Sequence, residues 1–155
     1  MTPAINMARK AGIEYRLHEY THDPNCDSYG EEAAAKLGVP EQQMFKTLVV
    51  SLDGKGLAVG IVPVSSRLSL KQLARAAGAK KATLAEPAAV ERATGYVLGG
   101  VSPLGQKKRL KTLIDGSAQA FPRIYVSAGR RGLEIELDPV DLARLTGAVF
   151  APLAV

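Results

Sequence analysis

Hydrophobic and polar residues along the chain follow patterns that predict strands at five places. Residues 13–20 and 132–137 alternate with a period of two, which is typical of half-buried strands. Apolar runs at 44–52 and 57–64 flank the turn sequence DGKG and predict a hairpin of two buried strands. A fifth strand is expected near 123–127, joined to 132–137 by the sequence AGRRG.

Short helices are predicted between these strands from the residues that begin and end helices. Thr2 before Pro3 begins one helix and Gly12 ends it, while Ser69 and Gln72 form a capping box ahead of another. Three more helices are expected at 28–38, 86–94 and 138–147.

Helices interspersed with strands and at least one hairpin indicate a mixed α/β fold. Regular alternation of strand and helix is absent, and the segment 106–120 has no clear period, so a doubly wound fold is not expected. The 155 residues contain no repeat, low-complexity tract or linker, and 46% of them are apolar. We therefore expect one domain, residues 1–155, with a self-sufficient core.

Composition argues for a protein of the cytoplasm. No apolar run approaches the roughly 20 residues of a membrane span, and the first residues, MTPAINMARKAGIEY, lack the apolar core of a secretory signal. The single cysteine, Cys26, cannot form a disulfide within the chain, which fits a reducing compartment. We expect no membrane partner.

Basic residues are concentrated in a few short segments, although the formal net charge of +5 is mild. The largest cluster consists of Lys107, Lys108, Arg109 and Lys111, and smaller pairs occur at 80–81 and 130–131. Such clusters suit a phosphate backbone, and an ordinary solvated basic face explains them equally well. Aromatic residues make up only 5% and Trp is absent, which argues against a platform for stacking bases.

The sequence HEYTH at 18–22 matches the zinc-protease motif H-E-x-x-H but does not fit its geometry. That motif requires a helix, in which positions i and i+4 lie about 6 Å apart on one face. The alternation that precedes it predicts a strand, in which His18 and His22 would stand about 13 Å apart. The chain has no third histidine. We therefore expect no metal site here.

Other motifs of enzyme active sites are absent or incomplete. The chain has no G-x-S-x-G sequence and no P-loop, and GYVLGG lacks the third glycine of a dinucleotide-binding motif. Cys26 lies in a polar loop with only two histidines as candidate bases. An enzyme of this sequence would work without a conventional nucleophile, metal or cofactor.

Three features remain as candidates for chemistry. Lys46 lies in an apolar strand, where a lysine either extends to water or does chemistry. Gly99 and Gly100, in GGVSP, form either a plain turn or a loop whose N–H groups hold an oxyanion. In LEIEL, Glu134 and Glu136 point away from the apolar positions. Either one of them is the partner of Lys46, or both form an exposed acidic face.

Five stretches of the chain resemble the bacterial YbaK-type Cys-tRNA(Pro) deacylases, free-standing relatives of the editing domain in bacterial prolyl-tRNA synthetases. The stretches are MTPAIN, LHEYTHDP, FKTLVV, TGYVLGGVSPLGQKKRLKT and IYVSAGRRGLEIEL. The resemblance extends nearly end to end, and the stretch around the glycines is its most specific part. It implies a mixed α/β domain with a central, largely antiparallel, barrel-like sheet and surrounding short helices.

The resemblance also implies an activity. Prolyl-tRNA synthetase mischarges cysteine onto the proline tRNA, and this family hydrolyses that ester. In the family's mechanism, the thiol of the bound cysteine attacks its own ester carbonyl and leaves as a cyclic thiolactone. The protein then needs only to bind, orient and stabilise charge. The implied partners are Cys-tRNA(Pro) and prolyl-tRNA synthetase, with no cofactor.

The family's functional residues are carried over by position. Lys46, in FKT, is implied to anchor the substrate near the terminal ribose and phosphate of the tRNA. Gly99, with Gly100 beside it, is implied to offer backbone N–H groups to the developing oxyanion. Tyr20 and Ser127 match residues that contact the substrate or line its pocket.

Glu134 falls where another member of the family has aspartate, so its longer side chain changes either the pocket or the pairing with Lys46. The basic run 107–111 is implied to bind tRNA phosphates, while the synthetase supplies selectivity for the proline tRNA. Two alternatives stay open. One is a deacylase for another aminoacyl ester, such as Ala-tRNA(Pro), and the other is a non-catalytic module that binds tRNA or a synthetase.

Overall fold

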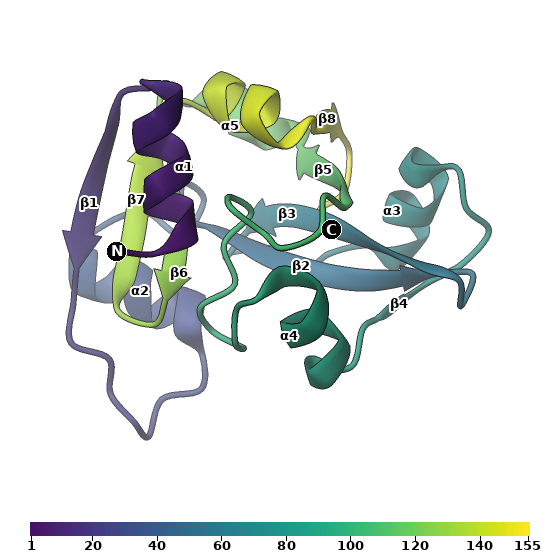
Figure 1. Cartoon of the computed structure of the whole chain (residues 1–155), viewed down its shortest axis with the longest axis horizontal. Helices are drawn as coiled ribbons and strands as arrows, with labels where there is room; N and C mark the ends of the chain where they lie inside the picture. Colours follow the sequence, from purple (N-terminus) through teal and green to yellow (C-terminus); the bar gives the residue numbers. More distant parts are fainter.

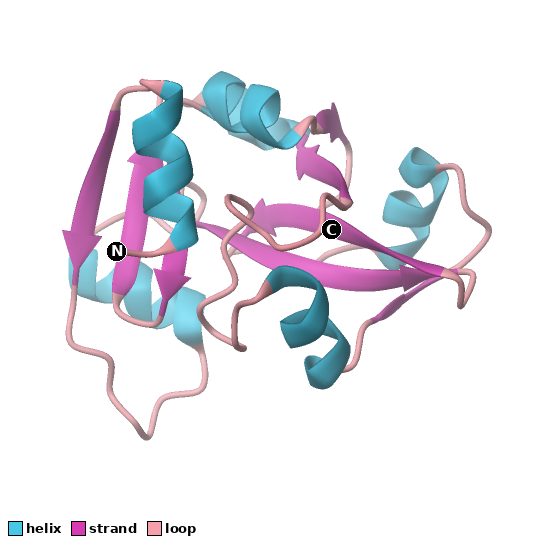
Figure 2. Cartoon of the chain, in the orientation of Figure 1, coloured by secondary structure: helices cyan, strands magenta, loops and turns pink.

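Two β-sheets form the frame of the computed structural model, which describes residues 1–155. The strands are β1 (Tyr15–Glu19), β2 (Phe45–Leu52), β3 (Gly56–Pro63), β4 (Ala82–Leu84), β5 (Lys111–Asp115), β6 (Ile124–Arg130), β7 (Leu133–Leu137) and β8 (Val149–Ala151). The helices are α1 (Pro3–Ala11), α2 (Tyr29–Leu37), α3 (Leu70–Ala77), α4 (Pro87–Thr94), α5 (Pro139–Thr146) and a 3₁₀-helix, η1 (Gly116–Ala120). Figure 1 shows how these elements are arranged, and Figure 2 separates helices from strands by colour.

The smaller sheet has the order β1-β7-β6 and is antiparallel throughout. The larger sheet has the order β4-β2-β3-β5-β8, and only the pairs that include β5 are parallel. A bridge between Met44 and Tyr125 joins the two sheets. The predicted mixed α/β fold with a largely antiparallel sheet is therefore confirmed, although the sheets do not close into a barrel.

The smaller sheet is covered by a helix on each face. Helix α1 lies across one face of β6 and β7, and α2 lies behind the sheet (Figure 1). On the α1 side, Leu133, Ile135 and Leu137 are buried in the main core cluster together with Ile5 and Ala8. Each of these large aliphatic side chains contributes about 1.5–3 kcal/mol by leaving water. The predicted alternation along β7 is confirmed, and its glutamates point toward the α2 side.

Three of the predicted helix starts have a side-chain hydrogen bond at the N-cap. The side-chain oxygens of Thr2, Ser69 and Asp138 each accept a hydrogen bond from a backbone N–H in the first turn. The capping box is only half formed, because the Ser69 N–H donates to the carbonyl of Leu153 at 2.7 Å. The Gln72 Oε1 is left buried without a partner.

The sequence does not predict β4, β5 or β8. Strand β5 lies in the segment 106–120, and it is a strand because it runs between β3 and β8 in the larger sheet. The other two strands span three residues each, too few to show a period. Asp115, at the end of β5, accepts hydrogen bonds from the N–H groups of Leu153 and Ala154 at 2.9 and 3.0 Å. Its carboxylate thus holds the last residues of the chain against β5.

Candidate functional site

A cavity of about 250 Å³ lies where the smaller sheet meets β2, the start of α2 and the loop after α4. Five residues that the sequence suggested for a site line it: Tyr20, Lys46, Gly99, Ser127 and Glu134. The remaining suggested residues, Gly100 and the basic run 107–111, do not line it. About half of its lining is hydrophobic, and a few polar groups converge on it, as in small-molecule sites generally.

Lys46 enters the cavity from the start of β2, opposite Val62 of β3. Its side chain is half-buried, and this desolvation lowers the pKa of the ammonium group. Glu31 opposes that shift and Arg67 adds to it, so both charged groups lie near Lys46. Lys46 belongs to no ion pair, and the pairing with Glu134 or Glu136 that the sequence left open does not form. Its ammonium group is therefore available to an anionic ligand.

The glycine loop, residues 98–101, forms the wall that lies against the start of α2. Gly99 has a φ of 86°, and a Cβ there would lie 2.8 Å from Arg131 Nε and 2.9 Å from the Tyr29 ring. Arg131 holds the loop against α2. Its Nε donates to the Leu98 carbonyl at 2.9 Å, and its guanidinium stacks over Tyr29. Only glycine fits this close approach.

Gly99 and Gly100 differ in what their backbones can offer a ligand. The Gly100 N–H donates to the Val97 carbonyl at 2.9 Å, and its Cα packs against the backbone of Arg130. The N–H groups of Gly99 and Val101 make no hydrogen bond within the chain. The Gly100 N–H is thus already used to close the turn, and Gly100 does not line the cavity, so its predicted contact with substrate stays a prediction.

Glu134 stands on β7, the central strand of the smaller sheet, and is only 6% exposed. It makes no side-chain hydrogen bond and belongs to no ion pair, and burial raises the pKa of its carboxyl to about 8. Glu136 is also largely covered and binds His18 Nε2 at 2.8 Å. The exposed acidic face that the alternation allowed is therefore wrong, because α2 covers this side of the sheet.

Ser127, on the neighbouring strand β6, and Tyr20, the residue after β1, lie near Glu134. Ser127 lies directly opposite Glu134 in the pairing of β6 with β7, and its Oγ accepts a hydrogen bond from the Gly129 N–H at 3.2 Å. Burial raises the pKa of the Tyr20 hydroxyl to about 12, and the nearby Glu134 adds to the shift. Tyr20 therefore keeps its proton and can donate a hydrogen bond.

Sequence reasoning missed Glu32, which anchors the loop 21–28 beside the cavity. Its carboxylate accepts hydrogen bonds from the Asp23 N–H at 2.8 Å and from Lys36 Nζ at 3.0 Å, and it binds His22 Nδ1 at 2.6 Å. His18 lies on a strand, as predicted, and binds Glu136. The two histidines of the HEYTH motif therefore bind different carboxylates. The only signal in the sequence is an acidic residue in the first turn of α2.

The Glu32→Gln variant is expected to be less stable than the wild type. Burial raises the pKa of this carboxyl, but its hydrogen bonds outweigh burial and hold the pKa at about 2. Because the unfolded value is 4.5, this stabilisation is present above about pH 4.5 and is lost as the pH falls toward 2. Loss of charge-assisted bonds should lower the free energy of unfolding at neutral pH by about 2–3 kcal/mol, measured by urea denaturation. The exposed Glu91→Gln is the control, and equal stability of the two variants would contradict the anchoring role.

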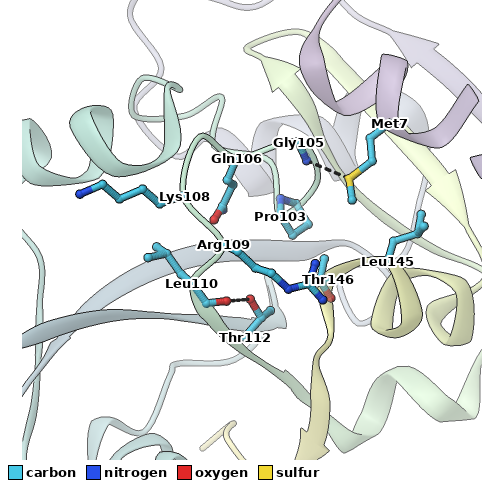
Figure 3. A pocket seen from close by; sticks show the side chains of 10 residues that line it. All are labelled: Met7, Pro103, Gly105, Gln106, Lys108, Arg109, Leu110, Thr112, Leu145 and Thr146. Carbon is cyan, nitrogen blue, oxygen red and sulfur yellow. Dashed lines mark hydrogen bonds between the residues drawn. The ribbon is translucent and has the colours of Figure 1, made fainter. Parts of the chain in front are cut away.

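The basic run 107–111 lies at helix ends rather than at the cavity. Lys111 Nζ donates to the carbonyl of Ala77, the last residue of α3, at 2.9 Å. Arg109 packs against Gly147 after α5, and Lys107 packs against Gly95 after α4. Positive charge at a helix C-terminus is favourable, so these exposed residues have a structural role beside any contact with tRNA. Lys108 and Arg109 line a separate cavity of about 90 Å³ between α1 and α5 (Figure 3).

Comparison with known proteins identifies the family of the chain. A family profile described as the aminoacyl-tRNA editing domain matches residues 23–145. The chain belongs to the aminoacyl-tRNA editing domain family. The matched range includes four of the five predicted site residues that line the cavity: Lys46, Gly99, Ser127 and Glu134.

Relatives of this editing domain differ in the amino acids that their names record. An Enterococcus faecalis protein named as a Cys-tRNA(Pro)/Cys-tRNA(Cys) deacylase, EbsC, is 37% identical over 150 residues, 97% of this chain and 91% of the relative. The Escherichia coli K12 multifunctional Ser/Thr-tRNA deacylase ProXp-y is 28% identical over 145 residues, 91% of this chain and 84% of the relative. A crystal structure described as a trans-editing enzyme for prolyl tRNA synthetase superposes with a TM-score of 0.81 at 25% identity, covering 100% of this chain and 99% of the other.

The expected enzyme class is confirmed by these similarities: this editing domain is an aminoacyl-tRNA deacylase. Membership of the family disfavours the non-catalytic binding module that the sequence left open. No helix of the editing domain combines the length and the apolar character needed to cross a membrane.

Proposed function

We propose that the chain removes cysteine from mischarged Cys-tRNA(Pro). The observation that carries the proposal is the composition of the cavity, which combines the unpaired Lys46, the free N–H groups of Gly99 and Val101, and no histidine or cysteine. Ser127 and Ser28 line the cavity, and neither hydroxyl is hydrogen-bonded to a histidine or a carboxylate. A cavity built in this way supports positioning and charge stabilisation and lacks an activated nucleophile of its own. Similarity to EbsC supports cysteine as the amino acid.

The substrate supplies the nucleophile in this proposal. The sulfur of the bound cysteine attacks its own ester carbonyl, so that a carbon–sulfur bond forms and the ester carbon–oxygen bond breaks. The thiol proton passes to the departing ribose oxygen, and the amino acid leaves as a cyclic thiolactone. Negative charge develops on the carbonyl oxygen, for which the N–H groups of Gly99 and Val101 are the available donors.

The remaining roles follow from position and charge. Lys46, with Arg67 nearby, holds the terminal phosphate and ribose of the tRNA, and Tyr20 donates a hydrogen bond from its hydroxyl. Ser127 shapes the pocket, and Gly100 supports the loop. The exposed side chains of the run 107–111 contact tRNA phosphates farther from the ester. Prolyl-tRNA synthetase is the proposed partner that selects the tRNA, and the cytoplasm is the proposed location.

A second candidate substrate is favoured by one comparison. The Escherichia coli relative is named as a deacylase for serine and threonine esters, so an ester other than that of cysteine, alanine included, is the alternative for this chain. Serine differs from cysteine only in having oxygen in place of sulfur, so shape alone separates the two poorly. Dependence on the thiol is what distinguishes the two proposals.

A deacylation panel tests the proposal. Purified protein is expected to release cysteine from Cys-tRNA(Pro) and to leave S-methylcysteinyl-, Ala-, Ser- and Pro-tRNA(Pro) largely intact. Lys46→Ala should lower kcat/KM for the cysteine ester by about 10- to 100-fold, the loss of one charge-assisted contact. Lys55→Ala, in the β2–β3 turn, is the matched control. Release of S-methylcysteine at the rate of cysteine would refute the thiol mechanism, and full activity of Lys46→Ala would refute the role of Lys46.

A further inference from the structure

The carboxyl group of Glu134 is buried at the wall of the cavity and has no partner within the chain. Its residue is only 6% exposed, yet it lines the cavity together with Lys46 and Tyr20. Neither of the two residues that the sheet places opposite it makes a hydrogen bond to its carboxyl. His18, across on β1, binds Glu136, and Ser127, across on β6, accepts from Gly129.

An unpaired buried carboxyl is costly, because burial removes water without supplying a hydrogen-bond donor in its place. Glutamate is rarely buried in this way unless it binds a metal, an ion or a ligand. No group of three or more metal-binding side chains surrounds it, so a metal ion is poorly supported. A cationic or hydrogen-bond-donating group of a ligand in the cavity is the partner that the geometry leaves open.

Lys46 and Glu134 enter the cavity from different sheets. Lys46 supplies positive charge from β2, and both Glu31, in the first turn of α2, and Arg67, in the segment that follows β3, lie near it. Glu134 supplies a carboxyl from the smaller sheet, where Tyr20 is its neighbour. A ligand that carries a phosphate at one end and an ammonium group at the other complements this separation. The 3′ end of an aminoacyl-tRNA has both, the phosphate in the tRNA backbone and the ammonium on the amino acid.

We infer that Glu134 binds the α-ammonium group of the aminoacyl ester and thereby selects substrates with a free amine. This inference rests on the proposed function for the identity of the ligand. The inference holds whichever amino acid the tRNA carries, because every aminoacyl ester has an α-ammonium group. This group is primary in all of them except the ester of proline, whose amine is secondary. It excludes N-acylated amino acids, which have no ammonium charge and are larger at this position.

Proton release should accompany binding of the amine. Burial raises the pKa of the free Glu134 carboxyl, so the group carries its proton at neutral pH, and an ammonium ion in contact with it favours the ionised form. The titratable groups that face it or share its cavity are His18 of β1, Tyr20 just after β1, Lys46 of β2, and Tyr29 and Glu31 of α2. Ligands without the amine should bind without this release.

Binding of stable analogues tests the inference. The probes are 3′-deoxyadenosine derivatives that carry a cysteinyl, seryl or alanyl group through an amide at the 3′ position, each paired with the counterpart that lacks the α-amino group. Calorimetry with wild-type protein is expected to show about 10- to 100-fold tighter binding of the amine-bearing member of each pair. In Glu134→Gln this preference should disappear while the affinity for the amine-free member is unchanged. Glu136→Gln, two residues along the same strand, should keep the wild-type preference.

The outcomes separate this inference from the proposed function. Equal binding of both members, failure of the amine-bearing member to bind, or equal weakening of both in Glu134→Gln would overturn the inference. Thermal melting of the variants, together with Glu134→Asp, which restores the charge, distinguishes loss of recognition from loss of folding. If wild-type protein shows the amine preference but hydrolyses none of the charged tRNAs, the proposed reaction fails and the inference stands.

Discussion

The wild-type protein is expected to lose stability as the pH rises from about 5 to about 8. The Glu134→Gln variant is expected to lack the part of this loss that comes from the Glu134 carboxyl. In the unfolded chain the Glu134 carboxyl has a pKa of 4.5, and burial raises the pKa to about 8 in the folded protein. Between these values the folded state holds a proton that the unfolded chain releases, so each pH unit favours unfolding by about 1.4 kcal/mol. The stabilisation is complete below pH 4.5 and is lost as the pH passes about 8, a total on the order of 5 kcal/mol.

Urea denaturation of both proteins across about pH 5–9 measures this contribution. The quantity of interest is the free energy of unfolding of wild type minus that of the variant, because groups common to both cancel. The difference should fall steadily with rising pH and then level off. Glu136→Gln removes a carboxyl from the same strand that is bound to His18, and it serves as the control. A pH-independent difference would show that Glu134 is ionised in the folded protein.

Helices and the long strands were predictable because local chemistry determines them. The side chains of Thr2 and Asp138 cap their helices in the structure as their positions in the sequence predict, and the two apolar runs around DGKG pair as a hairpin. Strands β4 and β8 could not be predicted, because three residues show no period and each exists through pairing with one neighbour. Tertiary pairing, rather than local preference, makes these segments strands.

The site was partly predictable from resemblance and less so from pattern. Residues from distant segments that the resemblance named, such as Tyr20, Lys46 and Gly99, do line one cavity. The environment of Glu134 was not predictable, because the alternation in LEIEL predicts a strand with one solvent-exposed face. In the structure β7 is the central strand and α2 covers that face, which turns an expected exposed acid into a buried one.

Charge clusters in sequence say little about where the charges are used. The run 107–111 suggested a phosphate-binding surface, yet Lys107, Arg109 and Lys111 each lie against the end of a different helix. Their proximity in sequence reflects a loop that passes three helix C-termini in succession. Arg131 belongs to one of the smaller basic pairs and has the more direct connection to the cavity, through Leu98 and Tyr29.

Replacement of Gly99 by alanine is expected to reduce deacylation by about 100- to 1,000-fold, the loss typical when a backbone donor to an oxyanion is displaced. A Cβ at this position would lie 2.8 Å from Arg131 Nε and 2.9 Å from the Tyr29 ring, and displacing Arg131 would break the contacts that hold it. Arg131 is hydrogen-bonded to Leu98 and stacked on Tyr29, which begins α2. The loop itself must therefore shift, and the free N–H groups of Gly99 and Val101 shift with it.

Gly12→Ala is the matched control, because it shares the backbone strain without the collision. Gly12 has a φ of 69°, against 86° at Gly99, and a Cβ added to Gly12 would have no other atom within 4 Å. Both variants should lose about 1–2 kcal/mol of stability from alanine in the left-handed region. Only Gly99→Ala should lose activity, measured as kcat/KM on the ester that the wild type hydrolyses best. Equal activities of the two variants would show that the position of the loop does not matter to the reaction, and the N–H groups of Gly99 and Val101 would then have no part in it.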